Sequence, residues 1–249
     1  MKKFFMFLAV IGFVALAAND VVAQTNDAAA QELLAGAASE APVYQQIKAK
    51  FIDGGVGFMA SILLCLILGL AVAIERIIYL SLSTTNTSKL IAKVEEALAN
   101  GGVEAALEVC RNTRGPVASI FYQGLSRMDQ GLEAVEKSVV SYGGVQAAQL
   151  ETGLTWLSLF IAMSPNLGFL GTVIGMIGAF DAIQAAGDIS PIVVASGIKV
   201  ALITTVAGLI VALILQVFFN YITAKIEGLV ITMEDASVSL IDILVKAKK

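Results

Sequence analysis

Three long apolar segments dominate the hydrophobic pattern of the chain. Residues 54–74 and 152–180 contain no charged side chain, and a third segment, 191–224, is interrupted only by Lys199. Each is long enough to cross the hydrocarbon core of a membrane, which takes about 20 helical residues. Because a membrane span must satisfy its backbone hydrogen bonds internally, we predict an all-α fold with three long transmembrane helices.

The N-terminal segment has the pattern of a secretory signal peptide. Lys2 and Lys3 precede an apolar run at 4–18, and small residues lead up to Gln24. We predict that residues 1–23 are a cleaved leader, with an uncleaved fourth helix as the alternative. Further on, residues 43–52 space their apolar side chains helically, which predicts a helix lying at a membrane interface.

The region between the first two spans has helical periodicity. Leu90, Val94 and Leu98 recur at intervals of four residues, and Gly101-Gly102 predicts a stop. Thr87-Ser88 are the predicted cap of this helix. Further helical patterning covers 117–128 and begins again at Leu132, from where we expect it to continue into the second span.

The distribution of Lys and Arg predicts the orientation. These residues concentrate in 75–153 and 225–249, whereas the loop 182–191 has none. Because positive charge favours the cytoplasmic side, we predict a periplasmic N-terminus and a cytoplasmic C-terminus in the bacterial inner membrane. The predicted segments are a signal peptide (1–23), a periplasmic tail with an interfacial helix (24–53), transmembrane helix 1 (54–80), a cytoplasmic helical region (81–151), transmembrane helix 2 (152–181), a periplasmic loop (182–191), transmembrane helix 3 (192–224) and a cytoplasmic C-terminal helix (225–249).

Composition excludes several classes of function. Hydrophobic residues make up 57% of the 249 residues and charged residues 14%, which argues against a soluble enzyme. The chain has no histidine, so Ser-His catalysis and histidine-ligated metal sites are excluded. A net charge of −4 argues against a nucleic-acid partner. We therefore expect a membrane protein that is not an enzyme and has no cofactor and no metal.

Polar side chains inside the second and third spans are the candidate functional groups. Thr172 lies in the second span, and Thr205 and Gln216 lie on one face of the third, where they would suit a water-lined path. Rows of small residues allow close helix packing, namely Gly168, Gly171, Gly175 and Gly208. The alternative is that the threonines only pack helices and bond their own backbone.

Two motifs on these spans resemble the MotA/TolQ/ExbB proton-channel family. They are SPNLGFLGTVIGM at 164–176 and GIKVALITTVAGL at 197–209. The three-span layout with a leader is most similar to the ExbB branch and its TolQ relatives, because the MotA branch has four spans.

The resemblance implies a function and a set of partners. It implies a homopentamer in the lipid membrane whose central pore holds the single-span helices of an ExbD-like protein. Proton flow would drive a TonB-like transducer and so energise outer-membrane transport, with Thr172 and Thr205 as pore threonines. The alternatives are a TolQ-like subunit of an envelope-maintenance motor and a non-conducting oligomeric scaffold. A secondary transporter is disfavoured because no internal repeat is visible.

One position departs from the family pattern. Many relatives carry a membrane glutamate where this chain has Val200, and the only carboxylates within 152–224 are Asp181 and Asp188. A hydroxyl relays a proton but does not store one near neutral pH, so we expect the partner to supply the titrating acid. Lys199 has two interpretations: it reaches the outer interface or an outer acid, or it faces the pore.

Overall fold

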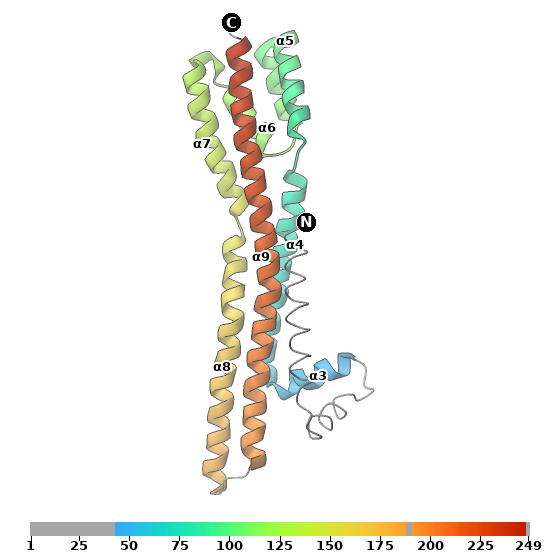
Figure 1. The fold of residues 1–249 in the computed structure, drawn as a ribbon, viewed down its shortest axis with the longest axis vertical. Coiled ribbons are helices and arrows are strands. Elements are labelled where there is room, and N and C mark those ends of the chain that lie inside the picture. The colour runs from blue at the N-terminus through green and yellow to red at the C-terminus, as the bar shows by residue number, and fades with distance from the viewer. Residues whose placement is uncertain (1–42, 188–190, 248–249) are drawn as a thin grey trace, which may run out of the picture. The chain divides into compact units, whose positions relative to one another are not determined.

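A computed structural model describes residues 43–187 and 191–247, and the described residues form only helices and their connections. The predicted signal peptide and the tail up to residue 42 lie outside this range. The helices, in chain order, are α3 (Val43–Asp53), α4 (Val56–Ser83), α5 (Thr87–Asn112), α6 (Pro116–Leu125), the short 3₁₀ helix η1 (Met128–Gln130), α7 (Leu132–Glu151), α8 (Leu154–Ala186) and α9 (Pro191–Ala247) (Figure 1).

Residues 50–249 form one unit, in which α4, α8 and α9 are the three long apolar helices. α8 and α9 lie side by side as an antiparallel pair, and α4 packs against both (Figure 1). Each of the three is long and apolar enough to cross a membrane, which confirms the predicted fold class. Large apolar side chains such as Leu64, Phe169 and Leu213 stand exposed on their outer faces, as lipid contact would require.

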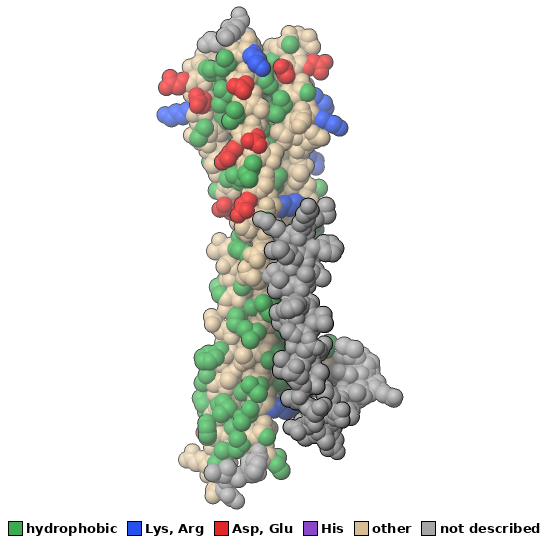
Figure 2. Space-filling model, in the orientation of Figure 1, with side chains coloured by type: hydrophobic (Ala, Val, Ile, Leu, Met, Phe, Trp, Pro, Cys, Tyr) green, Lys and Arg blue, Asp and Glu red, His purple; other side chains and the backbone are tan. Residues whose placement is uncertain are grey.

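α9 joins the apolar part of this unit to its polar part. Its 57 residues run without a break, which corresponds to about 85 Å at 1.5 Å per residue. The predicted transmembrane helix 3 and the predicted C-terminal helix are therefore parts of one continuous helix. The C-terminal half of α9 packs against α5, α6 and α7, where buried side chains such as Leu240 and Leu244 complete a core. Charged side chains gather over this end of the unit (Figure 2).

The start of α5 differs from the prediction. The N-cap is Asn86 and not Thr87-Ser88, because the Asn86 side chain accepts a hydrogen bond of 3.2 Å from the backbone N–H of Lys89. The predicted stop is present, since Gly102 has a left-handed φ of 70° that breaks the helix.

The expectation that α7 continues into the second span was wrong. α7 ends at Glu151, Thr152 leaves the helical conformation with a ψ of 134°, and Gly153 adopts a φ of 90° before α8 begins. This conformation costs a residue with a Cβ about 1–2 kcal/mol, so glycine permits the break. By contrast, α8 continues without a break through Pro165.

Candidate functional site

The two predicted threonines meet across the α8–α9 pair. The Oγ1 of Thr172 on α8 lies in hydrogen-bond contact with the Oγ1 of Thr205 on α9. Both side chains are half-buried and also reach two shared carbonyl oxygens. Thr172 lies 3.1 Å from the oxygen of Ala201 and 3.2 Å from that of Gly168, and Thr205 lies 3.3 Å and 3.4 Å from the same two atoms. Each hydroxyl has one proton to donate, so these contacts are alternatives that exchange by rotation of the O–H.

Glycines allow the two helices to approach closely enough for this contact. A Cβ on Gly168 would lie 2.9 Å from the carbonyl oxygen of Thr204, and one on Gly208 would lie 2.5 Å from that of Ser164. Gly171 faces the Thr204 side chain and Gly175 faces the Ala201 backbone. All four glycines that the sequence marks as packing residues therefore lie in the α8–α9 contact.

Two other hydroxyls of the spans are turned into the packed interior. Thr204 and Ser164 are both fully buried. Thr204 donates to the carbonyl of Ala201 at 2.8 Å, and Ser164 donates to that of Phe160 at 2.8 Å. Each bonds its own helix, which is a packing role. Consecutive helical residues point about 100° apart, so Thr204 and Thr205 have different surroundings.

A second polar pair follows farther along α9. The Nε2 of Gln216 donates to the Oδ1 of Asn220 at 3.1 Å, one helical turn away. Gln216 lies eleven residues beyond Thr205, or about 16 Å along the helix axis, so the two do not touch. Asn220 was not among the predicted site residues, although its i, i+4 spacing from Gln216 in an apolar segment is a signal for such a pair.

Lys199 forms an ion pair at the other end of the site. Its Nζ lies 2.6 Å from Oδ2 of Asp53, the last residue of α3. The hydrogen bond from Lys199 lowers the pKa of Asp53, and the positive charges of Lys199 and Lys50 act in the same direction. Of the two interpretations of Lys199, this geometry matches pairing with an acid outside the span.

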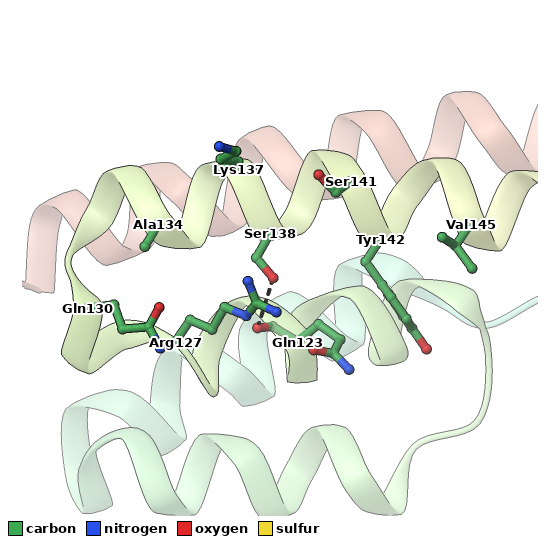
Figure 3. A pocket seen from close by; sticks show the side chains of 9 residues that line it. All are labelled: Gln123, Arg127, Gln130, Ala134, Lys137, Ser138, Ser141, Tyr142 and Val145. Carbon is green, nitrogen blue, oxygen red and sulfur yellow. Dashed lines mark hydrogen bonds between the residues drawn. The ribbon is translucent and has the colours of Figure 1, made fainter.

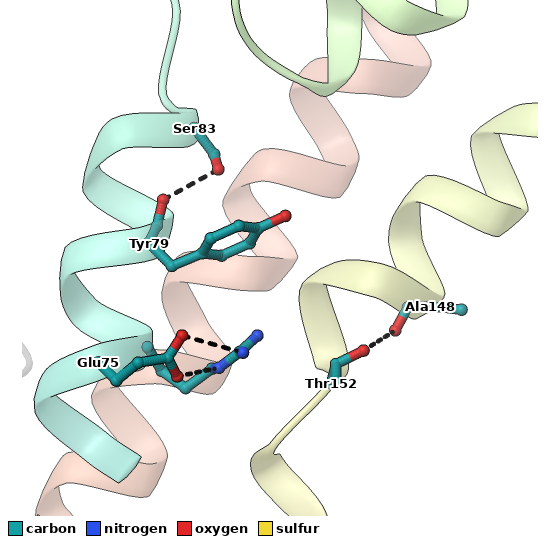
Figure 4. A network of polar contacts seen from close by, with 6 residues as sticks. Glu75, Tyr79, Ser83, Ala148 and Thr152 are labelled. Atoms are coloured by element: carbon teal, nitrogen blue, oxygen red, sulfur yellow. Dashed lines mark hydrogen bonds and ion pairs between the residues drawn. The ribbon is translucent and has the colours of Figure 1, made fainter. Parts of the chain in front are cut away.

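A charged cluster marks the end of α4 nearest the α7–α8 break. Arg76 binds its neighbour Glu75 through Nε at 2.7 Å and Nη2 at 3.1 Å, and its guanidinium lies 5.1 Å from the centre of the Tyr79 ring. Only 16% of the Arg76 side chain is exposed. A Cβ on Gly153 would lie 3.0 Å from its Nε. Figure 4 shows this cluster beside Thr152, whose hydroxyl donates to the carbonyl of Ala148.

The site therefore consists of hydroxyl, amide and carbonyl groups within apolar helices. Such groups can hydrogen-bond water and pass protons along, but they do not hold a proton near neutral pH. Within the described residues, no group of His, Cys, Asp and Glu side chains is arranged to hold a metal ion.

Comparison with known proteins agrees with this arrangement. Residues 112–235, which include α8 and most of α9, match the MotA/TolQ/ExbB proton channel family. A putative biopolymer transport protein ExbB homolog of Methanothermobacter thermautotrophicus is 36% identical over 162 residues, which is 65% of this chain and 57% of that protein. A putative biopolymer transport protein ExbB-like 1 of Synechocystis is 30% identical over 179 residues, or 70% of each chain.

A third relative matches more strongly over a shorter stretch. The biopolymer transport protein exbB1 of Vibrio cholerae is 47% identical over 68 residues, or 27% of this chain and 30% of that protein. The match thus spans little more than half of the archaeal relative and under a third of the Vibrio one. The chain is a multi-pass membrane protein with a threonine-bearing helix pair, and it belongs to the MotA/TolQ/ExbB proton channel family. Members of this family are not enzymes.

Proposed function

We propose that the chain is the proton-channel subunit of an ExbB–ExbD-type motor in the inner membrane. In this proposal, proton flow energises a TonB-like transducer and through it outer-membrane transport. The observation that carries the proposal is the contact between Thr172 and Thr205, which joins two hydroxyls across apolar helices. Such a pair is costly in a membrane unless it meets partners or water.

The chemistry assigns different tasks to the chain and its partner. Each threonine hydroxyl can accept a hydrogen bond from water and donate one onward, which is what a relay requires. The span offers no carboxylate beside this pair, because Val200 is aliphatic and Asp181 lies far along α8. A single-span, ExbD-like partner in a central pore would therefore bring the acid that takes up and releases the proton. Gln216, with Asn220, would extend the polar path along α9.

The second candidate function is a non-conducting scaffold, and one observation favours it. Both threonine hydroxyls have backbone carbonyls within reach, so the helix pair satisfies them without water or a partner. Under this alternative their role would be to hold α8 against α9.

Replacement by valine distinguishes the two functions, because valine keeps the shape of threonine and removes its hydroxyl. The assay is proton flux into liposomes that contain the chain and its single-span partner, beside a pull-down of that partner. We expect Thr172→Val and Thr205→Val to bind the partner and to conduct poorly. Thr223→Val is the matched control on α9, since the Thr223 hydroxyl is buried without a hydrogen-bond partner in the described structure. Full conduction in both variants would leave the threonines a packing role only, and absence of conduction by the unaltered chain with its partner would favour the scaffold. Loss of partner binding would assign the threonines to assembly.

We also propose that the chain assembles with copies of itself. The resemblance to the family implies that the assembly has five copies. Apolar side chains on the outer faces of α8 and α9, such as Phe169 and Leu202, leave room for contacts with other copies as well as with lipid. Native mass spectrometry from detergent should give a pentamer. A stable monomer or dimer would contradict this part of the proposal.

A further inference from the structure

A cleft lined by polar and apolar side chains lies between α6 and α7, outside the apolar helices. It has a volume of about 420 Å³ and a neighbour of about 470 Å³, and Gln123 and Tyr142 line both. Volumes of this size are typical of sites for small molecules. The proton path does not use either cavity.

The charges around the two cavities are all positive. Arg127 and Lys137 line the first, Arg111 lines the second, and neither has an Asp or Glu in its lining. The charged residues in the two linings are only basic, although the surrounding segment 81–152 holds eight acids and six bases. In the described part of the chain, none of the three cations forms an ion pair with an acid. A cleft lined in this way favours an anion.

Arg127 is one of the two cations that line the first cavity. Figure 3 shows Arg127 among the side chains that line this cavity, together with Ser138 and Gln123. Ser138 is buried and its hydroxyl lies 3.4 Å from the Gln123 carbonyl oxygen, so this wall of the cavity is packed and polar. The fork of N–H donors on arginine matches the oxygens of a phosphate group.

The position of the cleft indicates the source of the anion. Its α7 residues run from Ala134 to Val145, which the helical rise places about 9–26 Å before the end of α7 at Glu151. The apolar span begins only at Leu154, and the headgroup layer adds about 5–7 Å to each side of the hydrocarbon core. With the membrane boundary placed at Leu154, the cleft therefore lies beyond the lipid headgroup layer.

We propose that this cleft binds a soluble molecule carrying two phosphate groups, one held by Arg127 and the other by Arg111. Tyr142 and Gln123 line both cavities. They would donate hydrogen bonds to the phosphate oxygens of the bound molecule. The proposed phosphate binding does not depend on the proposed proton conduction by the chain.

The test is isothermal titration of the full chain, purified in a neutral detergent, with inorganic pyrophosphate. We expect binding that weakens at high ionic strength. Arg127→Gln and Arg111→Gln should each weaken it by about tenfold or more, as the loss of charged hydrogen bonds implies. Lys93→Gln is the matched control, because it removes the same charge from an exposed part of α5 that lines neither cavity. Thr172→Val should bind pyrophosphate as the unaltered chain does.

Three results would overturn the proposal. They are the absence of pyrophosphate binding, an equal loss in Lys93→Gln and Arg127→Gln, and binding of short-chain phosphatidylglycerol without binding of pyrophosphate. Thermal melting of each variant shows whether it is folded. Arg127 and Arg111 are exposed, so their replacement should leave the fold intact.

Discussion

Lys199 on α9 and Asp53 at the end of α3 form an ion pair, with 2.6 Å between Nζ and Oδ2. This pair gives the lysine of the third span an acidic partner outside that span. It also occupies the lysine next to Val200.

Removing the lysine should raise the pKa of Asp53. In Lys199→Met we expect this pKa to rise toward the ordinary carboxyl value, because the hydrogen bond that holds it down is lost. Since the folded-state pKa is lowered, the contribution of the pair to stability is present above the ordinary carboxyl pKa. It disappears as the pH falls through the lowered value. The measurement is the pH titration of the ¹³C-labelled Asp53 carboxyl in detergent.

Lys50→Met is the control for this prediction, because Lys50 acts on Asp53 only through its charge and is the weakest influence. It should shift the pKa less than Lys199→Met does. Equal shifts would show that the ion pair does not form in solution.

The close contact of α8 and α9 should not tolerate a methyl group at Gly208. Its Cβ would lie 2.5 Å from the carbonyl oxygen of Ser164, a backbone atom that cannot move without the helix. Gly208→Ala should therefore lower stability by about 1–3 kcal/mol. Thermal unfolding in detergent measures the change.

Gly228→Ala is the matched control on the same helix, since a Cβ there meets nothing within 4 Å. We expect it to be neutral or to stabilise the chain by about 0.5–1 kcal/mol through helix propensity. If both variants melted alike, the α8–α9 contact would be looser than the structure shows.

The break between α7 and α8 should depend on Gly153. Gly153→Ala must adopt a positive φ and also press against Arg76, so we expect a loss of about 1–2 kcal/mol from the backbone alone. Gly144→Ala, inside α7 and facing open space, is the control. A gain of stability in Gly153→Ala, measured by the same melts, would indicate that α7 and α8 form one continuous helix in solution.

The orientation in the membrane remains to be tested by cysteine labelling. A cysteine at position 45 should react with a membrane-impermeant maleimide from outside, and one at position 130 should react only from the cytoplasmic side. The native thiols of Cys65 and Cys110 are both buried, so we expect them to contribute little background labelling by the maleimide. The reverse pattern would overturn the predicted topology.

The apolar runs were enough to predict three long helices, because a membrane span requires length and the absence of charge and little else. Gly101-Gly102 likewise marked a break in α5 correctly, since glycine pairs disfavour helix locally. The two motifs also placed Thr172 and Thr205 at corresponding positions on the second and third spans.

Tertiary structure decided which polar groups meet. Thr204 and Thr205 are neighbours in the sequence, yet only Thr205 reaches the Thr172 hydroxyl, whereas the Thr204 side chain lies against Gly171 and donates to Ala201 of its own helix. The ion pair of Lys199 joins residues 146 positions apart, and the cationic cleft gathers three residues from α5 to α7. Helical periodicity gives each helix its faces, but the packing of helix against helix determines which faces come together.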